Sequence, residues 1–206
     1  MNTWERMGAF GLGCWVLGGA CWGAAGASRA ESVGNRPGDV SKRLDSDATA
    51  RKRGHELAMF GAGCFWGVED AFRKVSGVTA TAAGFTGGSR ANPTYEEVCA
   101  GKTGHCEAVL VEFDPRRVSY DRLLSTFFSM HDASRKCPIG YQYRSAIFTF
   151  AESQRTVAIA GIQAAKKRGL DAQTEIAKAG TFWLAELYHQ QYYDKHRTQG
   201  KGKPER

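Results

Sequence analysis

The run Gly61-Ala62-Gly63-Cys64-Phe65-Trp66-Gly67 marks the point where a predicted strand gives way to a predicted helix. The apolar run at 58–61 is typical of a short strand, and apolar residues at 65, 68, 72 and 75 follow helix spacing. Gly77 is expected to end that helix. A cysteine at such a junction lies beside unpaired backbone N–H groups, whose positive potential lowers a thiol pKa. Cys64 is therefore a candidate nucleophile, and a small buried core cysteine is the alternative.

Strands and helices alternate along the rest of the chain. Strands are predicted at 79–85, 108–113, 144–150 and 173–176, helices at 95–99, 119–128 and 153–167, and an aromatic-rich segment at 182–193. The connections vary in length and several loops are long. This pattern predicts an α+β fold in one compact domain at 57–197, and the 42% hydrophobic and 24% charged composition suits such a domain.

The flanking segments differ in composition from the domain. Residues 7–27 are apolar, small and uncharged, and small-x-small sites follow, so 1–30 is predicted to be a targeting presequence, secretory or organellar, with a weak membrane anchor as the alternative. A cytoplasmic location is less expected. The polar stretch 31–56 reads as a disordered linker, and 198–206 as a basic tail.

Charge and cysteine usage exclude several classes of function. The formal net charge is +7, but the basic residues are scattered and do not interleave with aromatics, so no nucleic-acid partner is expected. The six cysteines form no C-x-x-C pair, which argues against zinc ribbons and thioredoxin-type motifs. Cys99, His105 and Cys106 lack a fourth ligand, so neither a metal nor another cofactor is expected.

The glycines around Cys64 also resemble a dinucleotide-binding loop. Their spacing, G-x-G-x-x-x-G, is one residue too long, and Phe65 and Trp66 stand where a pyrophosphate must approach the backbone. No acidic residue lies between Asp70 and Glu96, where the ribose partner is expected. This interpretation is rejected.

Other polar residues are candidates for chemistry. Glu107 begins a predicted strand, and burial there would raise its pKa and make it a general acid; an exposed loop glutamate is the alternative. Tyrosines in 142–145 and 188–192 can orient an oxygen atom of a ligand, or simply pack at a surface. A Cys–His acyl-transfer enzyme also stays open, because it needs only one of the histidines at 105, 131 and 189 beside Cys64.

A series of short runs, taken in order, resembles the peptide-methionine sulfoxide reductase A family, which acts on the S epimer of the sulfoxide. The resemblance covers nearly all of 57–197. The runs are Gly63-Cys64-Phe65-Trp66-Gly67, Gly84-Phe85-Thr86-Gly87-Gly88, Asn92-Pro93-Thr94-Tyr95-Glu96, Thr103-Gly104-His105, Glu107, Phe113-Asp114-Pro115, His131-Asp132, Gln142-Tyr143-Arg144-Ser145, Thr174-Glu175-Ile176, Ala185-Glu186 and His189-Gln190.

The resemblance implies a ferredoxin-like, two-layer α+β sandwich with a mixed sheet and long irregular loops. It implies that Cys64 attacks the sulfoxide sulfur and that Glu107 protonates the departing oxygen. Such general acid catalysis typically contributes ~10²–10⁴-fold to a rate. Methionine is released, and Cys64 becomes a sulfenic acid that a thiol and a reductant must restore.

The resemblance also assigns a substrate pocket. Tyr95 and Tyr143 resemble the tyrosines that hydrogen-bond the sulfoxide oxygen, with Tyr192 as a third pocket tyrosine. Phe65 and Trp66 resemble the wall that holds the ε-methyl group. The implied partners are methionine sulfoxide, free or in proteins, and thioredoxin or a similar thiol reductant; a monomer is expected.

The chain departs from the family pattern where the sulfenic acid would be resolved. The tail 200–206 carries no cysteine, and the stretch between His131-Asp132 and Gln142 is shorter than usual. Cys137-Pro138 takes the place of the family's Asn-Asp, so an acidic group usually near the substrate is missing. Cys137 is predicted to resolve the sulfenic acid, with Cys106 or an external thiol as alternatives. The altered loop also leaves open a module that binds oxidised methionine without reducing it.

Overall fold

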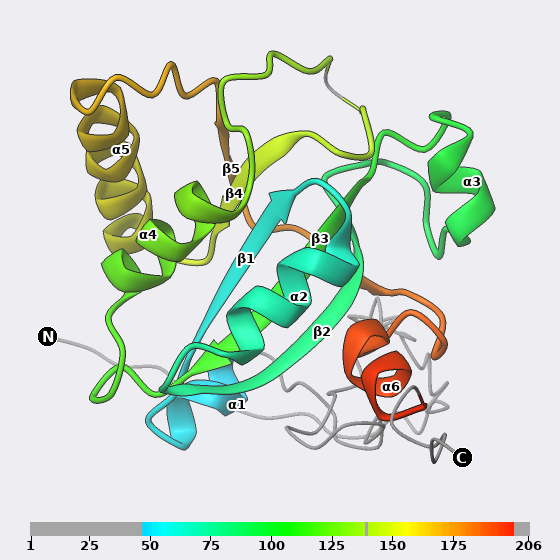
Figure 1. The fold of residues 1–206 in the computed structure, drawn as a ribbon, viewed down its shortest axis with the longest axis horizontal. Coiled ribbons are helices and arrows are strands. Elements are labelled where there is room, and N and C mark those ends of the chain that lie inside the picture. Colours follow the sequence, from blue (N-terminus) through cyan, green and yellow to red (C-terminus); the bar gives the residue numbers. More distant parts are fainter. Residues whose placement is uncertain (1–46, 139, 200–206) are drawn as a thin grey trace, which may run out of the picture.

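The computed structural model describes residues 47–138 and 140–199 of the chain (Figure 1). The predicted presequence at 1–30, most of the predicted linker and the last seven residues of the tail lie outside the described residues. Among the helices of the described part, none is long and apolar enough to span a membrane.

Most predicted elements are confirmed to within a few residues. The helices are α1 (Asp47–Lys52), α2 (Phe65–Arg73), α3 (Tyr95–Cys99), α4 (Tyr120–Met130), α5 (Glu152–Lys167) and α6 (Tyr192–Gln199). The strands are β1 (Glu56–Ala62), β2 (Val78–Thr86), β3 (Cys106–Phe113), β4 (Ser145–Thr149), β5 (Glu175–Lys178) and β6 (Trp183–Leu184). The predicted segment at 182–193 divides into β6, a turn and the start of α6.

The strands form one mixed sheet of six, in the order β5-β4-β1-β3-β2-β6. The β4–β5 pair is parallel and the others are antiparallel. Ala62 pairs with Ser145, and Thr86 with Cys106, so β1 and β2 end where β3 and β4 begin. Cys64 and Glu107, which are far apart in the sequence, both lie at this end of the sheet. The mixed sheet with its helices confirms the predicted α+β fold class.

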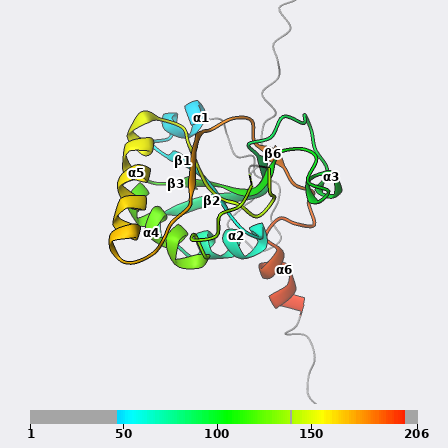
Figure 2. The same ribbon diagram turned by 90° about the horizontal axis from the view of Figure 1, so that it is seen from above.

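The two faces of the sheet carry different covers. Phe60, Val109 and Ile147 face a core shared with α2, α4 and α5, which lie together over one face (Figure 1). The alternate residues, such as Met59 and Phe148, face a second core that includes a residue of α1, which Figure 2 shows on the opposite side. Because side chains alternate along a strand, adjacent residues of β3 serve different cores.

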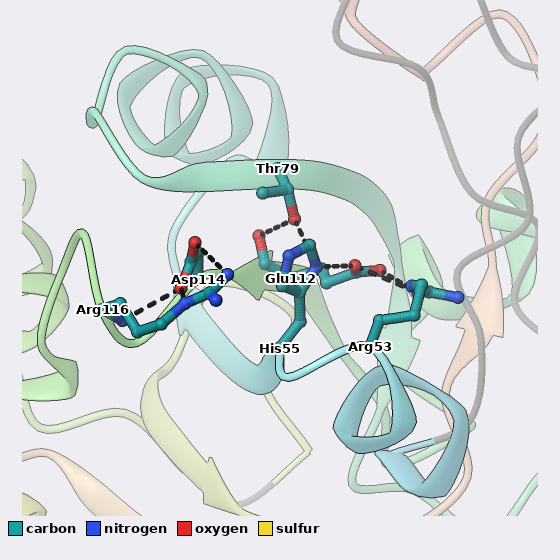
Figure 3. Close-up of polar contacts among 6 residues, drawn as sticks. All are labelled: Arg53, His55, Thr79, Glu112, Asp114 and Arg116. Carbon is teal, nitrogen blue, oxygen red and sulfur yellow. Dashed lines mark hydrogen bonds and ion pairs between the residues drawn. The ribbon is translucent and has the colours of Figure 1, made fainter.

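Helix α1 lies inside the segment predicted as linker, 31–56, and the structure corrects the end of that prediction. Ala50 is fully buried against the sheet. Arg53 donates to both carboxylate oxygens of Glu112 at 3.0 and 3.1 Å, and His55 Nδ1 lies 2.6 Å from the same carboxylate (Figure 3). A short polar helix shows no apolar periodicity, and the residues directly after it are held by contacts 57 and 59 residues away along the chain. No local signal therefore predicts the helix.

Candidate active site

Cys64 stands at the turn between β1 and α2. Gly63 has a φ of +88°, in the left-handed region that favours glycine, and lets the chain leave the sheet sharply. Cys64 is the N-cap residue of α2, with extended backbone, and it is exposed. The predicted strand-to-helix junction is therefore confirmed, and the alternative of a buried core cysteine is wrong.

The predicted direction of the Cys64 pKa shift is wrong. The backbone N–H groups of Trp66 and Gly67 do lower the pKa, as expected at a helix start. Partial removal of water from around the thiol is the larger effect, and with the negative charge of Glu107 it raises the Cys64 pKa above the usual value. The sequence indicates the helix terminus beside Cys64, but it does not indicate how much of the surrounding protein shields the thiol from water.

Glu107 lies at the start of β3, with its side chain 1% exposed on the face covered by α2. Its Oε2 accepts a hydrogen bond of 2.9 Å from the backbone N–H of Phe65, the residue after Cys64. Its Oε1 is buried and has no hydrogen-bond partner within the described residues. Burial raises the Glu107 pKa to about 7, although the Phe65 N–H opposes the shift. The exposed-loop alternative is therefore wrong.

Tyr95 and Tyr143 share the electrostatic environment of this carboxylate. The Tyr95 pKa is raised mainly by a hydrogen bond with the side chain of Cys99 and, to a smaller extent, by burial. Burial and the charges of Glu107 and Cys64 raise the Tyr143 pKa. Both phenols therefore stay protonated at neutral pH and can donate. The backbone N–H of Glu107 donates to the Gln142 carbonyl at 2.8 Å, which ties the loop before Tyr143 to β3.

Aromatic rings gather at the start of α2, directly after Cys64, and form what is called here the aromatic wall. The rings of Trp66 and Tyr192 stack with centroids 3.7 Å apart and planes 5° apart. Phe65 is 1% exposed, and its ring lies 5.9 Å from Phe85 and 6.3 Å from Tyr95. The His189 ring lies 4.9 Å from Phe65, 5.7 Å from Trp66 and 4.4 Å from Tyr95 and so joins these two groups. Phe65, Trp66, Tyr95 and Tyr192 therefore belong to one cluster, although they come from separate parts of the chain.

The remaining cysteines are placed differently from one another. Cys137 is half-buried in the loop between α4 and β4, and neither it nor Cys64 is in a disulfide. Cys106 belongs to the second core, on the sheet face opposite Glu107, and burial raises its pKa to about 12. Cys99 is exposed, one helical turn after Tyr95. The placement of Cys106 argues against the alternative that it resolves a Cys64 sulfenic acid.

The three histidines considered for Cys–His chemistry have other partners. His189 Nδ1 accepts from the Trp66 indole at 3.0 Å. The other two bond to loop and helix groups: His105 to Gly88 N and Arg90 O, and His131 to Phe127 O and Ser145 Oγ. None of these contacts activates Cys64 as a Cys–His pair requires. The described residues also contain no group of three metal-ligating side chains.

Two buried charged side chains, Arg144 and Glu69, frame the site, and no sequence pattern predicts a role for them. Arg144 is 3% exposed; it bonds to Glu175 at 3.1 Å and to the Gly104 carbonyl at 3.3 Å, which joins β5 to a site loop. Glu69 is 1% exposed and accepts from Thr81 Oγ1 at 3.0 Å and Gln191 N at 2.7 Å. Glu69 is a charged residue beside Val68 on the apolar face of the predicted helix, which could have indicated a buried carboxylate. Its partner Gln191, however, lies 122 residues away in the sequence.

The raised pKa of Glu107 has a consequence for stability. The folded state binds a proton more tightly than the unfolded chain, so this stabilisation is full below pH ~4.5 and is lost as pH rises through about 7. Burial raises the Glu69 pKa to about 7 in the same way. In Glu107→Gln, the decline in unfolding free energy between pH 4.5 and 8 should shrink by roughly 3 kcal/mol. Denaturant titrations across this range would measure it, with Glu69→Gln in parallel; a decline equal to that of the wild type contradicts the shift.

Comparisons with known proteins agree with this geometry. A family model described as peptide methionine sulfoxide reductase matches residues 56–203. The chain is 52% identical over 153 residues to peptide methionine sulfoxide reductase MsrA of Methanoculleus marisnigri, covering 71% of this chain and 93% of that protein. The relative from Geobacter sulfurreducens is 50% identical over 147 residues, 68% of this chain and 91% of that one.

Two solved structures share the fold. Methionine sulfoxide reductase A of Corynebacterium diphtheriae has a TM-score of 0.60 at 35% identity, covering 73% of this chain and 78% of that one. Reduced Mxr1 from Saccharomyces cerevisiae has a TM-score of 0.64 at 27% identity, with coverages of 74% and 90%. The matched span includes Cys64, Glu107 and the aromatic wall. The chain therefore belongs to the peptide methionine sulfoxide reductase family.

Proposed function

We propose that this protein reduces the S-sulfoxide of methionine, free or within proteins, to methionine through a sulfenic acid on Cys64. The observation that carries the proposal is the placement of Glu107. One of its oxygens is fixed to the N–H of the residue after Cys64, and the other is buried with no partner among the described residues. With a pKa of about 7, Glu107 is partly protonated at neutral pH and can donate from that oxygen.

The net reaction moves one oxygen atom between two sulfurs. The Cys64 sulfur attacks the sulfoxide sulfur, while Glu107 delivers a proton to the sulfoxide oxygen as its bond to that sulfur weakens. Tyr95 and Tyr143 donate hydrogen bonds to the same oxygen. The hydroxide released from the sulfoxide, or a water molecule in its place, then bonds to the Cys64 sulfur, and the bond between the two sulfurs breaks. The substrate sulfur has gained two electrons and leaves as methionine, and Cys64 is left as a sulfenic acid.

The electrostatics of the pair favour this division of roles. The ionised Glu107 raises the Cys64 pKa, so protonation of the carboxyl removes one of the effects that oppose a thiolate. A proton on Glu107 and a negative charge on Cys64 therefore support each other. The same carboxyl that supplies the proton also influences when the nucleophile is ionised.

The aromatic wall supports a methionine side chain as the substrate. Trp66 is partly exposed and stacks on Tyr192, so it offers an apolar surface directly after Cys64 in the chain that suits the ε-methyl group. Phe65, 1% exposed, lines the site from within the core. The pocket thus combines an apolar wall with donors for one oxygen. The exposed thiol of Cys64 and the Glu107 carboxyl, whose pKa of about 7 is close to neutral pH, favour a reductase over a module that only binds oxidised methionine. Binding alone requires neither group.

We further propose that Cys137 regenerates Cys64. Its thiol condenses with the sulfenic acid, water leaves, and a Cys64–Cys137 disulfide forms, which a dithiol reductant of the thioredoxin class opens. Cys137 lies in the loop that carries Tyr143, so a movement of this loop changes its distance from the site. Mxr1 from Saccharomyces cerevisiae is known in a reduced and an unusual oxidized form. Such turnover would serve protein repair under oxidative stress, and a monomer suffices for it.

We infer a ferredoxin-like arrangement for the central part of the sheet. In support, β1, β2, β3 and β4 follow the spatial order β4-β1-β3-β2 with antiparallel neighbours, and α2 and α4 connect the outer and inner strands. In this inference, β5 and β6 are additions to the two edges.

The nucleophile is tested with a dithiothreitol-dependent assay. Wild-type protein should reduce a peptide with methionine S-sulfoxide and leave the R epimer, whereas Cys64→Ser should show no measurable turnover because the attacking sulfur is gone. Cys106→Ser, whose thiol faces the second core, is the control and should retain activity when it folds like the wild type. If the wild type binds the sulfoxide peptide but does not reduce it, the proposed reductase activity is contradicted, and the protein is a module that binds oxidised methionine.

The resolving thiol is tested by changing the reductant. Cys137→Ser should keep its activity with dithiothreitol, which reduces the sulfenic acid directly, and lose at least about tenfold with thioredoxin. Peptide mapping of the wild type after one turnover should find Cys64 linked to Cys137. Cys106→Ser is the control, since its thiol faces the other core. Normal thioredoxin-dependent turnover of Cys137→Ser would rule this route out.

A further inference from the structure

We propose that His189 is a positioning residue for the substrate pocket: its unprotonated Nδ1 orients the indole of Trp66, and Glu186 holds the ring proton on Nε2. The inference rests on the proposed function, in which Trp66 forms part of the wall for the ε-methyl group. Neither His189 nor Glu186 contacts the reacting atoms in the proposed mechanism. Their effect on catalysis is therefore indirect, through the place of Trp66.

The contact with Trp66 fixes the role of one ring nitrogen. Trp66 Nε1 lies 3.0 Å from His189 Nδ1. An indole N–H can only donate, so Nδ1 must accept and carries no proton. The His189 side chain is 2% exposed, and its ring lies 4.9 Å from the Phe65 ring and 4.4 Å from the Tyr95 ring. The imidazole is thus packed among three of the proposed site residues.

The second ring nitrogen faces a carboxylate. In a neutral ring whose Nδ1 accepts, the proton is on Nε2. Nε2 lies 3.9 Å from Glu186 Oε2, and both atoms are buried without a hydrogen-bond partner among the described residues. A negative charge at this distance favours a proton on the facing nitrogen. Glu186 therefore selects the tautomer that can accept from Trp66.

Glu186 is itself anchored to another part of the site. Its Oε1 accepts from the backbone N–H of Tyr95, the first residue of α3, at 3.0 Å. The order of contacts is thus Tyr95, Glu186, His189 and Trp66. It connects the helix that carries a proposed oxygen-binding tyrosine to the proposed methyl-binding wall, so that the two halves of the pocket keep their separation.

The charges around the ring are consistent with a neutral histidine. Burial lowers the His189 pKa; Glu186 and Glu96 oppose this shift, and Lys195 adds to it. Protonation would place an N–H on Nδ1 against the indole N–H and break their hydrogen bond. An imidazole that only filled space would not depend on which nitrogen holds the proton, and this difference makes the proposal testable.

Two variants of similar size separate the acceptor from the bulk of the ring. Asparagine places an oxygen near the position of Nδ1, whereas leucine places a methyl group there. In single-turnover reactions of reduced enzyme with methionine S-sulfoxide, His189→Leu should raise the half-saturating concentration about tenfold, because a partly buried indole N–H loses its acceptor. Its limiting rate should change less than threefold, and His189→Asn should stay within about threefold of the wild type in both quantities.

Nitrogen NMR gives a readout that does not need activity. The ¹⁵N shifts of His189 should be those of an unprotonated Nδ1 and a protonated Nε2 near pH 7, and the Trp66 Nε1–H resonance should move more in His189→Leu than in His189→Asn. A protonated Nδ1, equal losses in both variants, or no loss in either would overturn the proposal. If the wild type fails to reduce sulfoxide while NMR shows the expected tautomer, the proposed function fails and the Trp66–His189 contact stands.

Discussion

The hydrogen bond from the Phe65 backbone N–H to Glu107 is the interaction on which the site depends. It uses an N–H that the first turn of a helix leaves unpaired, and it binds the start of α2 to the start of β3. The carboxyl is thereby held beside Cys64 at the end of the sheet. A single N–H does not offset the loss of water around Glu107, so the carboxyl keeps a pKa of about 7. The same contact thus gives the acid its position and leaves it able to hold a proton.

The C-terminal segment is fixed to β2 and α2 by three consecutive residues and supplies part of the site. Gln190 bonds to Ala83 N and O and to the Ala185 carbonyl, and so fastens the turn before α6 to β2. Gln191, with a positive φ of 52°, gives its N–H to Glu69 on α2. Tyr192 follows directly and stacks on Trp66. Residues more than 120 positions from the nucleophile therefore set the aromatic wall beside it.

Local patterns predict the parts of the site that depend on neighbours in sequence. The apolar spacing after Cys64 predicts α2, and the position of Glu107 before a clear strand predicts its place at a strand start. The direction of the Cys64 pKa shift, helix α1 and the Trp66–His189 contact were not predictable, because each depends on burial or on partners far along the chain. Cys137 as the resolving thiol stays a prediction, since both it and Cys64 are free thiols in the structure.

Glu107 is proposed to act as the acid in the step that oxidises Cys64. The most direct test is the single-turnover rate of methionine S-sulfoxide reduction by reduced wild-type and Glu107→Gln proteins, with folding of both checked by denaturant titration. Glutamine keeps an oxygen for the Phe65 N–H but cannot transfer a proton. We expect a fall of ~10²–10⁴-fold in the limiting rate of Glu107→Gln, with the half-saturating concentration nearly unchanged. A limiting rate within about threefold of the wild type would contradict it.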